Sequence, residues 1–308
     1  MQTDADLIVV GAGPAGLEAA LIAARARLRV RVIDAPASRR NASASWVHGT
    51  IGLDHLSPDA LRARGQESLA RCGVVVESGC VANVGQDEHG LVVVLRDHAS
   101  SSLRARRVLL ATGLHDVLPE LAGLAETWGA TSFSCPYCHG LEISREGEAR
   151  WGVLAHEVAA LKMAPLYTRW ARRVVLFTDG RQPPSELRAA HEAAGLVYET
   201  GRVRALRHEG SALRAVVLED DREIAIDALV HRPTRTLGPL VETLGLMRDE
   251  HGLVVVNGRG ETSRKGLHAC GDLTTTPHQI VFAMADGAHA AMAIVSAIAF
   301  EDVLLHRA

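Results

Sequence analysis

The feature that most constrains the fold is a glycine-rich turn near the start of the chain. Residues 7–10 form an apolar run, the segment 11–16 reads Gly-Ala-Gly-Pro-Ala-Gly, and residues 17–26 are rich in alanine. A second apolar run follows at 29–33, so the segment predicts a strand, a turn, a helix and a parallel strand. This is the context in which the pattern Gly-x-Gly-x-x-Gly binds a dinucleotide.

The positions of the three glycines fit a phosphate-binding turn. Gly11 allows the tight turn, Gly13 lets a pyrophosphate approach the backbone, and Gly16 lets the helix pack on the sheet. Free N–H groups and a partial positive charge at the start of the helix favour phosphate. Asp34 ends the second strand, where an acid would hold ribose hydroxyls. A glycine turn without a ligand is the alternative, and the combination of strand, turn, helix and acid favours the binding site.

A similar pattern opens the second half of the chain. Residues 152–154, 158–170 and 173–177 predict a strand, a helix and a strand. Residues 114–119 and 232–235 predict connectors between the two units. The length of 308 residues also suggests about two domains, at ~100–200 residues per domain.

Three strand-like runs at 74–77, 91–95 and 103–110 have no long helix between them, and they predict an antiparallel meander. A long helix is expected from about residue 277 to residue 299. Its most apolar part, residues 290–300, is shorter than the ~20 residues that span a bilayer. We therefore expect no membrane segment.

Charge and cysteine content argue against several classes of protein. The formal net charge is −3, which gives no reason to expect nucleic acid or an anionic membrane as a partner. Five cysteines are too few for a disulfide scaffold and suggest intracellular thiols. The chain starts with polar and acidic residues rather than the basic start of a secretory signal, so a cytoplasmic protein is expected.

The segment 135–140 reads Cys-Pro-Tyr-Cys-His-Gly and carries the most chemical information. Its two cysteines suit the first turn of a helix, where the dipole lowers a thiol pKa and the pair can cycle between dithiol and disulfide. A zinc site would need four ligands, and the other cysteines are isolated: Cys72, Cys80 and Cys270. We therefore expect no metal, with Cys135 and Cys138 as a redox pair and His139 as a general base.

Two distant segments indicate which dinucleotide binds. Residues 108–113 end in Ala-Thr-Gly, and residues 270–272 read Cys-Gly-Asp. Together with the glycine turn, they resemble the flavoprotein family that contains thioredoxin reductase. The resemblance implies an α/β fold with two Rossmann-like dinucleotide-binding domains, the second inserted in the first. Residues 1–116 and 238–308 would form the FAD-binding domain, and 117–237 the inserted NAD(P)H-domain-like module with the CxxC.

Within this family the redox segment is similar to one branch. Bacterial thioredoxin reductases carry an acid after their CxxC, where this chain has His139. The form here resembles the FAD-dependent dithiol oxidases that close disulfides in natural products such as gliotoxin, holomycin and romidepsin. By the resemblance to the wider family, Asp272 would contact the ribityl or phosphate part of FAD, and Gln279, one turn into the last helix, would contact the flavin pyrimidine. The full set of implied FAD contacts is Gly11, Gly13, Pro14, Ala15, Gly16, Asp34, Arg39, Arg40, Asn41, His48, Val81, Ala111, Thr112, Gly113, Gly271, Asp272, His278 and Gln279.

The inserted module lacks a matching phosphate loop. Aligned with the family pattern, residues 151–160 place Ala155 and Glu157 at the positions of the first two glycines. The carboxylate opposes a pyrophosphate by its bulk and by its charge. Residues 178–181 also lack the arginine cluster that binds the 2′-phosphate of NADP. The second nucleotide site is therefore expected to be degenerate.

These features predict that electrons pass from a small-molecule dithiol to the CxxC, to FAD and then to O2, which gives H2O2. By resemblance, Cys135 meets the substrate, Cys138 meets the flavin, and the protein is a homodimer. An NAD(P)H-dependent, thioredoxin-reductase-like disulfide reductase is the alternative. A non-catalytic flavin-bound redox sensor is a third possibility from a different class.

Overall fold

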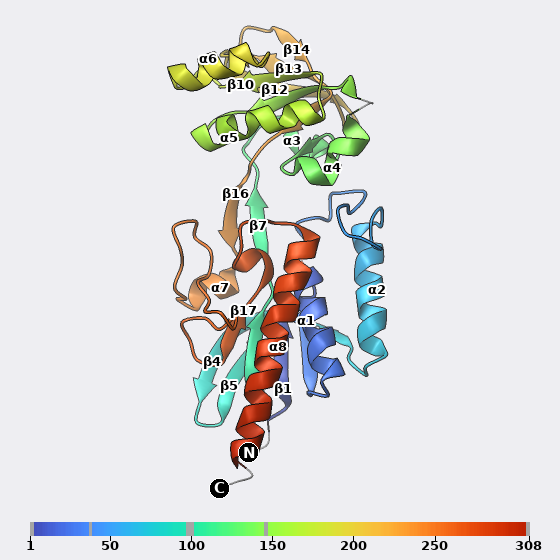
Figure 1. Ribbon diagram of the computed structural model, residues 1–308, viewed down its shortest axis with the longest axis vertical. Helices are drawn as coiled ribbons and strands as arrows, with labels where there is room; N and C mark the ends of the chain where they lie inside the picture. Colours follow the sequence, from blue (N-terminus) through green and yellow to red (C-terminus); the bar gives the residue numbers. More distant parts are fainter. Residues whose placement is uncertain (1–2, 37–38, 97–101, 145–146, 306–308) are drawn as a thin grey trace.

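The chain forms two α/β bodies that are stacked along the long axis and joined by a two-stranded ribbon (Figure 1). The computed structural model describes residues 3–36, 39–96, 102–144 and 147–305. One body takes its strands from both ends of the chain and the other from the middle. The predicted fold class, two Rossmann-like units with one inserted in the other, is confirmed.

The first body contains a seven-stranded sheet in the order β3-β2-β1-β6-β5-β4, with β17 beside β6. Both faces of β1 are buried, with Ile8 and Val10 on one side and Leu7 and Val9 on the other, as expected for a central parallel strand. The elements of this body are β1 (Ala5–Val10), α1 (Pro14–Arg25), β2 (Val30–Asp34), α2 (Pro58–Ala70), β3 (Val76–Ser78), β4 (Val81–Asp87), β5 (Gly90–Leu95), β6 (Ser102–Leu110), α7 (Pro239–Thr243), β17 (Leu267–Ala269) and α8 (Ile280–Leu305).

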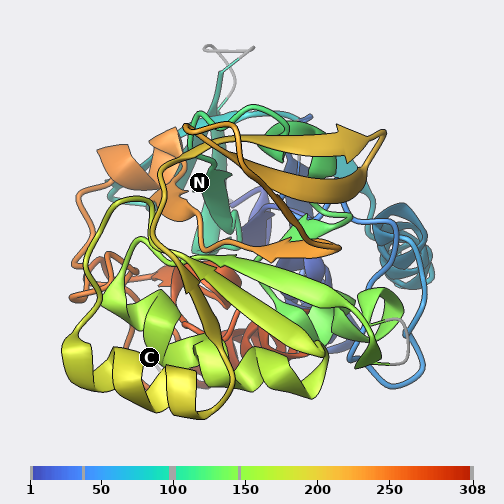
Figure 2. The same ribbon diagram turned by 90° about the horizontal axis from the view of Figure 1, so that it is seen from above.

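The second body contains a parallel five-stranded sheet in the order β11-β10-β9-β15-β8. Helices α5 and α6 cover one face, and an antiparallel sheet of β12, β13 and β14 covers the other (Figure 2). Its elements are α3 (Leu124–Thr127), β8 (Ser132–Phe133), α4 (Pro136–Ile143), β9 (Arg150–Leu154), α5 (Val158–Met163), β10 (Arg173–Phe177), α6 (Ser185–Ala193), β11 (Val197–Glu199), β12 (Val203–Glu209), β13 (Ala212–Leu218), β14 (Glu223–Ala225) and β15 (Ala228–Val230).

The predicted connectors do join the two bodies, but the sequence did not predict that they pair as strands. β7 (Leu114–Val117) pairs antiparallel with β16 (Thr234–Leu237), and the two strands form the ribbon seen in Figure 1. The predicted meander is wrong at its first strand. β3 pairs in parallel with β2, and the meander consists of β4, β5 and β6.

Helix α8 differs from its prediction in two ways. It begins at Ile280, so Gln279 lies just before the helix rather than one turn into it. It is also longer than predicted: residues 280–304 are long and apolar enough to cross a membrane by length and composition alone, so the sequence argument from length is wrong. One face of α8, which includes Ala290, Ile294 and Ile298, is buried in the first body.

Further helices depart from the predicted pattern, among them α3 and α7, which the sequence did not predict. The predicted helix at 158–170 is interrupted, because α5 ends at Met163 and a 3-10 helix continues over Ala164–Arg169, which includes Pro165. The sequence analysis missed α2 and α6. For α2 a signal is present, since Ser57 caps the helix by accepting from the amide of Ala60 and Pro58 occupies the first turn.

Candidate functional site

The two bodies and the ribbon line an open cavity of about 520 Å³. The predicted redox pair and His139 line it together with the predicted cofactor contacts, except Gly16 and Gly271. Gly16 and Gly271 instead allow neighbouring parts of the chain to pack closely. A Cβ at Gly16 would lie 1.9 Å from the carbonyl oxygen of Gly11, and Gly271 has a φ of 75° with its Cβ position 2.8 Å from the Cβ of Ala15.

The glycine turn between β1 and α1 presents open backbone to this cavity. Gly13 is the N-cap of α1, no side chain caps the helix, and a Cβ at Gly13 would meet nothing within 4 Å. The helix has twelve residues, so its first N–H groups and its dipole can hold a phosphate. The turn therefore fits the pyrophosphate of a dinucleotide.

Unpaired polar atoms at the cavity wall also fit a bound cofactor. The hydroxyl of Thr112 and both ring nitrogens of His278 are buried and have no hydrogen-bond partner among the described residues. Buried polar groups of this kind are costly unless a ligand or water satisfies them. Thr112 follows β6 and His278 precedes α8, so both parts of the first body contribute.

Arginines position the carboxylates of the cavity. Arg40 donates to Asp116 at 2.9 Å and to Asp272 at 2.8 Å, and so joins the ribbon to the C-terminal part of the first body. Asp34 accepts from the amide of Ala12 and also pairs with Arg39, at 2.6 Å. The loop after β2 is therefore fixed over the glycine turn.

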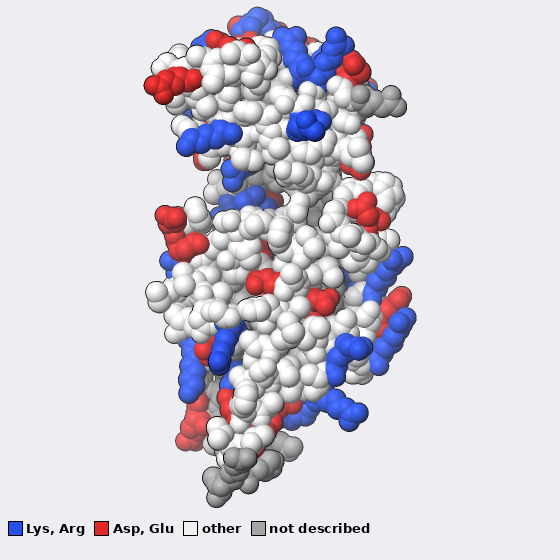
Figure 3. Space-filling model, viewed as in Figure 1, with Lys and Arg blue, Asp and Glu red and all other residues white. Residues whose placement is uncertain are grey.

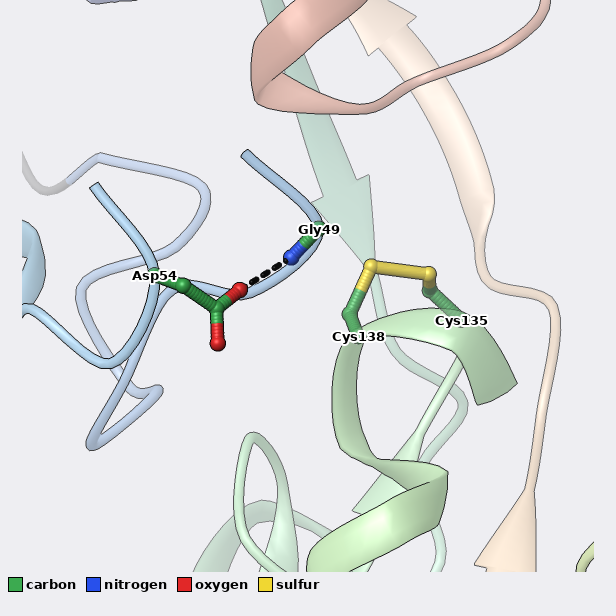
Figure 4. Close-up of a disulfide and its surroundings, with 4 residues drawn as sticks. All are labelled: Gly49, Asp54, Cys135 and Cys138. Carbon is green, nitrogen blue, oxygen red and sulfur yellow. Dashed lines mark hydrogen bonds between the residues drawn. A yellow bond between two sulfur atoms is a disulfide. The ribbon is translucent and has the colours of Figure 1, made fainter. Parts of the chain in front are cut away.

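The redox pair lies at the start of α4, as the sequence predicts. Cys135 is the N-cap of this helix and forms a disulfide with Cys138, with a Cα–Cα distance of 5.3 Å. Figure 4 shows the disulfide facing the loop that carries Gly49 and Asp54. Both cysteines line the cavity, so a substrate thiolate that enters it reaches the disulfide.

His139 follows the disulfide and is largely buried against Phe133, with 5.2 Å between the ring centroids. Burial lowers the pKa of His139 below its ordinary value of 6.5, the charge of Glu142 opposes the shift, and His48 adds to it. The imidazole is therefore neutral at neutral pH and can accept a proton from a thiol. By contrast, burial raises the pKa of the Cys270 thiol, which leaves that cysteine protonated.

Two tryptophans, Trp46 and Trp128, also line the cavity. Neither was assigned to the site from the sequence. Trp46 comes from the loop after β2, and Trp128 from the end of α3. No local signal marks Trp128, because only the tertiary fold brings it to the cavity. Phe133 also lines the cavity, whereas Tyr137, beside Cys138, is 60% exposed and packs edge-on against Trp170.

The second nucleotide loop has a different geometry. Glu157 is the exposed N-cap of α5, which has six residues. A carboxylate therefore stands where the pyrophosphate of a pyridine nucleotide would meet bare backbone. Arg202 lies against Gly180 of the loop at 178–181, and Arg181 of that loop pairs with Asp179.

The chain belongs to the pyridine nucleotide-disulphide oxidoreductase family, whose model matches residues 5–287. Two similar proteins are thioredoxin reductase sirT of Leptosphaeria maculans and thioredoxin reductase tcpT of Claviceps purpurea, each 32% identical. The alignment with sirT covers 92% of this chain and 91% of the relative, and that with tcpT covers 87% and 86%. The predicted resemblance to thioredoxin-reductase-like flavoproteins is confirmed, and this relationship implies a flavin cofactor.

Solved structures also resemble this chain over nearly its full length. The crystal structure of HlmI has a TM-score of 0.90 and 33% identity, covering 98% of this chain and 94% of HlmI. An oxidoreductase from Agrobacterium tumefaciens has a TM-score of 0.87 and 32% identity, with 97% and 99% covered. The arrangement of the two bodies is therefore shared with these proteins over nearly their full length.

Proposed function

We propose that this protein is a FAD-dependent dithiol oxidase that closes an intramolecular disulfide in a small natural product. The contrast between the two nucleotide loops carries the proposal. The first loop offers the open backbone of Gly13 to a cofactor, whereas the second offers the carboxylate of Glu157. A protein that binds flavin and not NAD(P)H receives its electrons from the thiol side.

The residues of the cavity support each step of this chemistry. A substrate thiolate attacks Cys135, the disulfide breaks, and Cys138 leaves as a thiolate. His139 accepts the proton of the second substrate thiol, which then attacks the substrate sulfur of the mixed disulfide. The product disulfide forms, and Cys135 leaves as a thiolate, so the substrate has lost two electrons and two protons. The FAD that the first loop would hold would supply the two-electron acceptor for the enzyme dithiol, and O2 would take up these two electrons together with the two protons lost by the substrate to give H2O2.

The cavity wall supports a small substrate. Trp46, Trp128 and Phe133 line the cavity together with the redox pair. An aromatic wall suits a compact ring system with two thiols better than an extended polar peptide.

A second candidate is an NAD(P)H-dependent disulfide reductase. Two observations favour it: curated relatives are named thioredoxin reductase, and Arg181 and Arg202 both border the loop at Gly180. The two functions differ in which reductant reaches the flavin.

Anaerobic mixing of the flavin-loaded protein distinguishes the two candidates. With dithiothreitol we expect the flavin absorbance to bleach, and with NADPH we expect it to persist. Fast, stoichiometric bleaching by NADPH would reject the oxidase. In air, Cys138→Ser is expected to abolish dithiol-dependent O2 consumption while flavin stays bound, and Cys72→Ser, the matched control at a free cysteine, is expected to retain it.

A further inference from the structure

A cluster of two histidines and a glutamate lies beside the redox helix, and one of them, His48, also lines the cavity and is among the implied FAD contacts. His48 and His55 belong to the loop between β2 and α2, and Glu142 belongs to α4. Each offers a ligand atom, and these atoms all lie within 4.8 Å of one another. The Nε2 of His48 lies 3.3 Å from Glu142.

The loop is folded so that its two histidines are neighbours. Val47 pairs with Leu56 in an antiparallel bridge, and the amide of His55 donates to the carbonyl of Val47. His48 and His55 are therefore the next residues inside the bridge. His55 also has a φ of 64°, a strained conformation that glycine adopts more easily.

Neighbouring groups orient both rings. The ring of Trp46 stacks on His55, with 4.6 Å between centroids and 10° between planes. The Nδ1 of His48 lies 3.3 Å from Asp54, and Asp54 is itself held by the amide of Gly49 at 2.7 Å (Figure 4). A carboxylate on the far nitrogen of a histidine is the usual support for a metal-binding imidazole, because it fixes the tautomer and leaves the other nitrogen free to bind.

We propose that His48, His55 and Glu142 form a binding site for a divalent cation of the Zn²⁺ type. Two imidazole nitrogens and a carboxylate oxygen are ligands that zinc prefers, at bond lengths of about 2.0–2.1 Å. Such bonds place tetrahedral ligand atoms about 3.3 Å apart. The ligand atoms lie within 4.8 Å of one another, so a bound cation would draw them closer together.

The position of the site gives the cation a structural effect. Glu142 is four residues after Cys138 on α4, so both lie on the same side of the redox helix. A cation held by His48, His55 and Glu142 connects the loop of the first body to the helix that carries the disulfide. It therefore restrains the redox pair against the cavity.

Titration of the oxidised, flavin-loaded protein with Zn²⁺ tests the site, because the closed disulfide removes two competing thiols. By calorimetry we expect one equivalent of Zn²⁺ to bind. His55→Gly removes one ligand and relieves the backbone strain, so the variant folds, and Glu142→Gln removes another. Each is expected to weaken Zn²⁺ binding by at least about tenfold. His251→Ala, at an exposed histidine elsewhere, is the control and should bind as the wild type does.

A second readout measures the connection between the bodies. Zn²⁺ is expected to raise the melting temperature of the wild type and of His251→Ala, but not that of His55→Gly. The proposal is rejected if the wild type does not bind millimolar Zn²⁺, or if His55→Gly binds Zn²⁺ as tightly as the wild type.

Discussion

At the scale of single residues, the two glycines of the first loop make separable predictions. A side chain at Gly13 would point into open space, so Gly13→Val should leave the fold intact and block the approach of the pyrophosphate. We expect flavin content to fall at least about tenfold, while the unfolding free energy of the flavin-free protein falls by only ~1 kcal/mol, because valine is a poorer N-cap than glycine. Absorbance spectra and urea titrations measure both quantities. Full flavin content in Gly13→Val would show that the pyrophosphate lies elsewhere.

His139 makes a prediction about pH. Burial lowers the pKa of His139, so the neutral base persists at pH values below its ordinary pKa of 6.5. As pH falls, kcat/KM for dithiol oxidation is therefore expected to decline only below pH 6.5, when the imidazole becomes protonated. His139→Gln should lower kcat/KM by about 10²–10⁴-fold and remove this acid limb. If the decline of kcat/KM at low pH is unchanged in His139→Gln, a group other than His139 causes that decline.

At the scale of elements, the sequence was informative wherever a short segment determines its own structure. The turn at 11–16 and the CxxC at a helix start both depend on local backbone geometry, and both lie where the sequence predicts. Contacts between segments that are far apart in the sequence could not be predicted, because no local pattern specifies them. The ribbon of β7 and β16 depends on contacts across more than a hundred residues, and the cavity position of Trp128 depends on how the two bodies meet.

The contact between α1 and α8 provides a prediction for an element. Gly287 lets these helices approach, because a Cβ there would lie 2.2 Å from the backbone oxygen of Ala15. Alanine has the better helix propensity by ~1 kcal/mol, but the overlap with backbone forces the helices apart. We expect Gly287→Ala to lower the unfolding free energy by ~1–3 kcal/mol in urea titrations. Ser296→Ala, at an exposed position of the same helix, should be neutral, and a stabilised Gly287→Ala would contradict this packing.

At the scale of the whole molecule, the outer face of α8 needs a partner. Phe282, Met292, Phe300 and Val303 follow one another at helical spacing on the exposed side, and Phe300 is 72% exposed. Mostly uncharged side chains cover α8 in Figure 3. An exposed apolar stripe of this length is typical of an interface. We propose that a second copy of the chain covers it, in agreement with the homodimer that the family resemblance implies.

Sedimentation analysis tests this assembly. We expect the wild type to sediment as a dimer and the double variant Met292→Glu/Phe300→Glu as a monomer, because each dimer would bury unpaired carboxylates at a cost of several kcal/mol. Val75→Glu introduces the same charge at an exposed apolar residue away from α8 and should remain dimeric. The length and apolar character of α8 allow one competing outcome, a lipid surface as the partner. A wild type that is monomeric in solution and floats with neutral lipid vesicles would reject the dimer, whereas a dimer that does not float supports it.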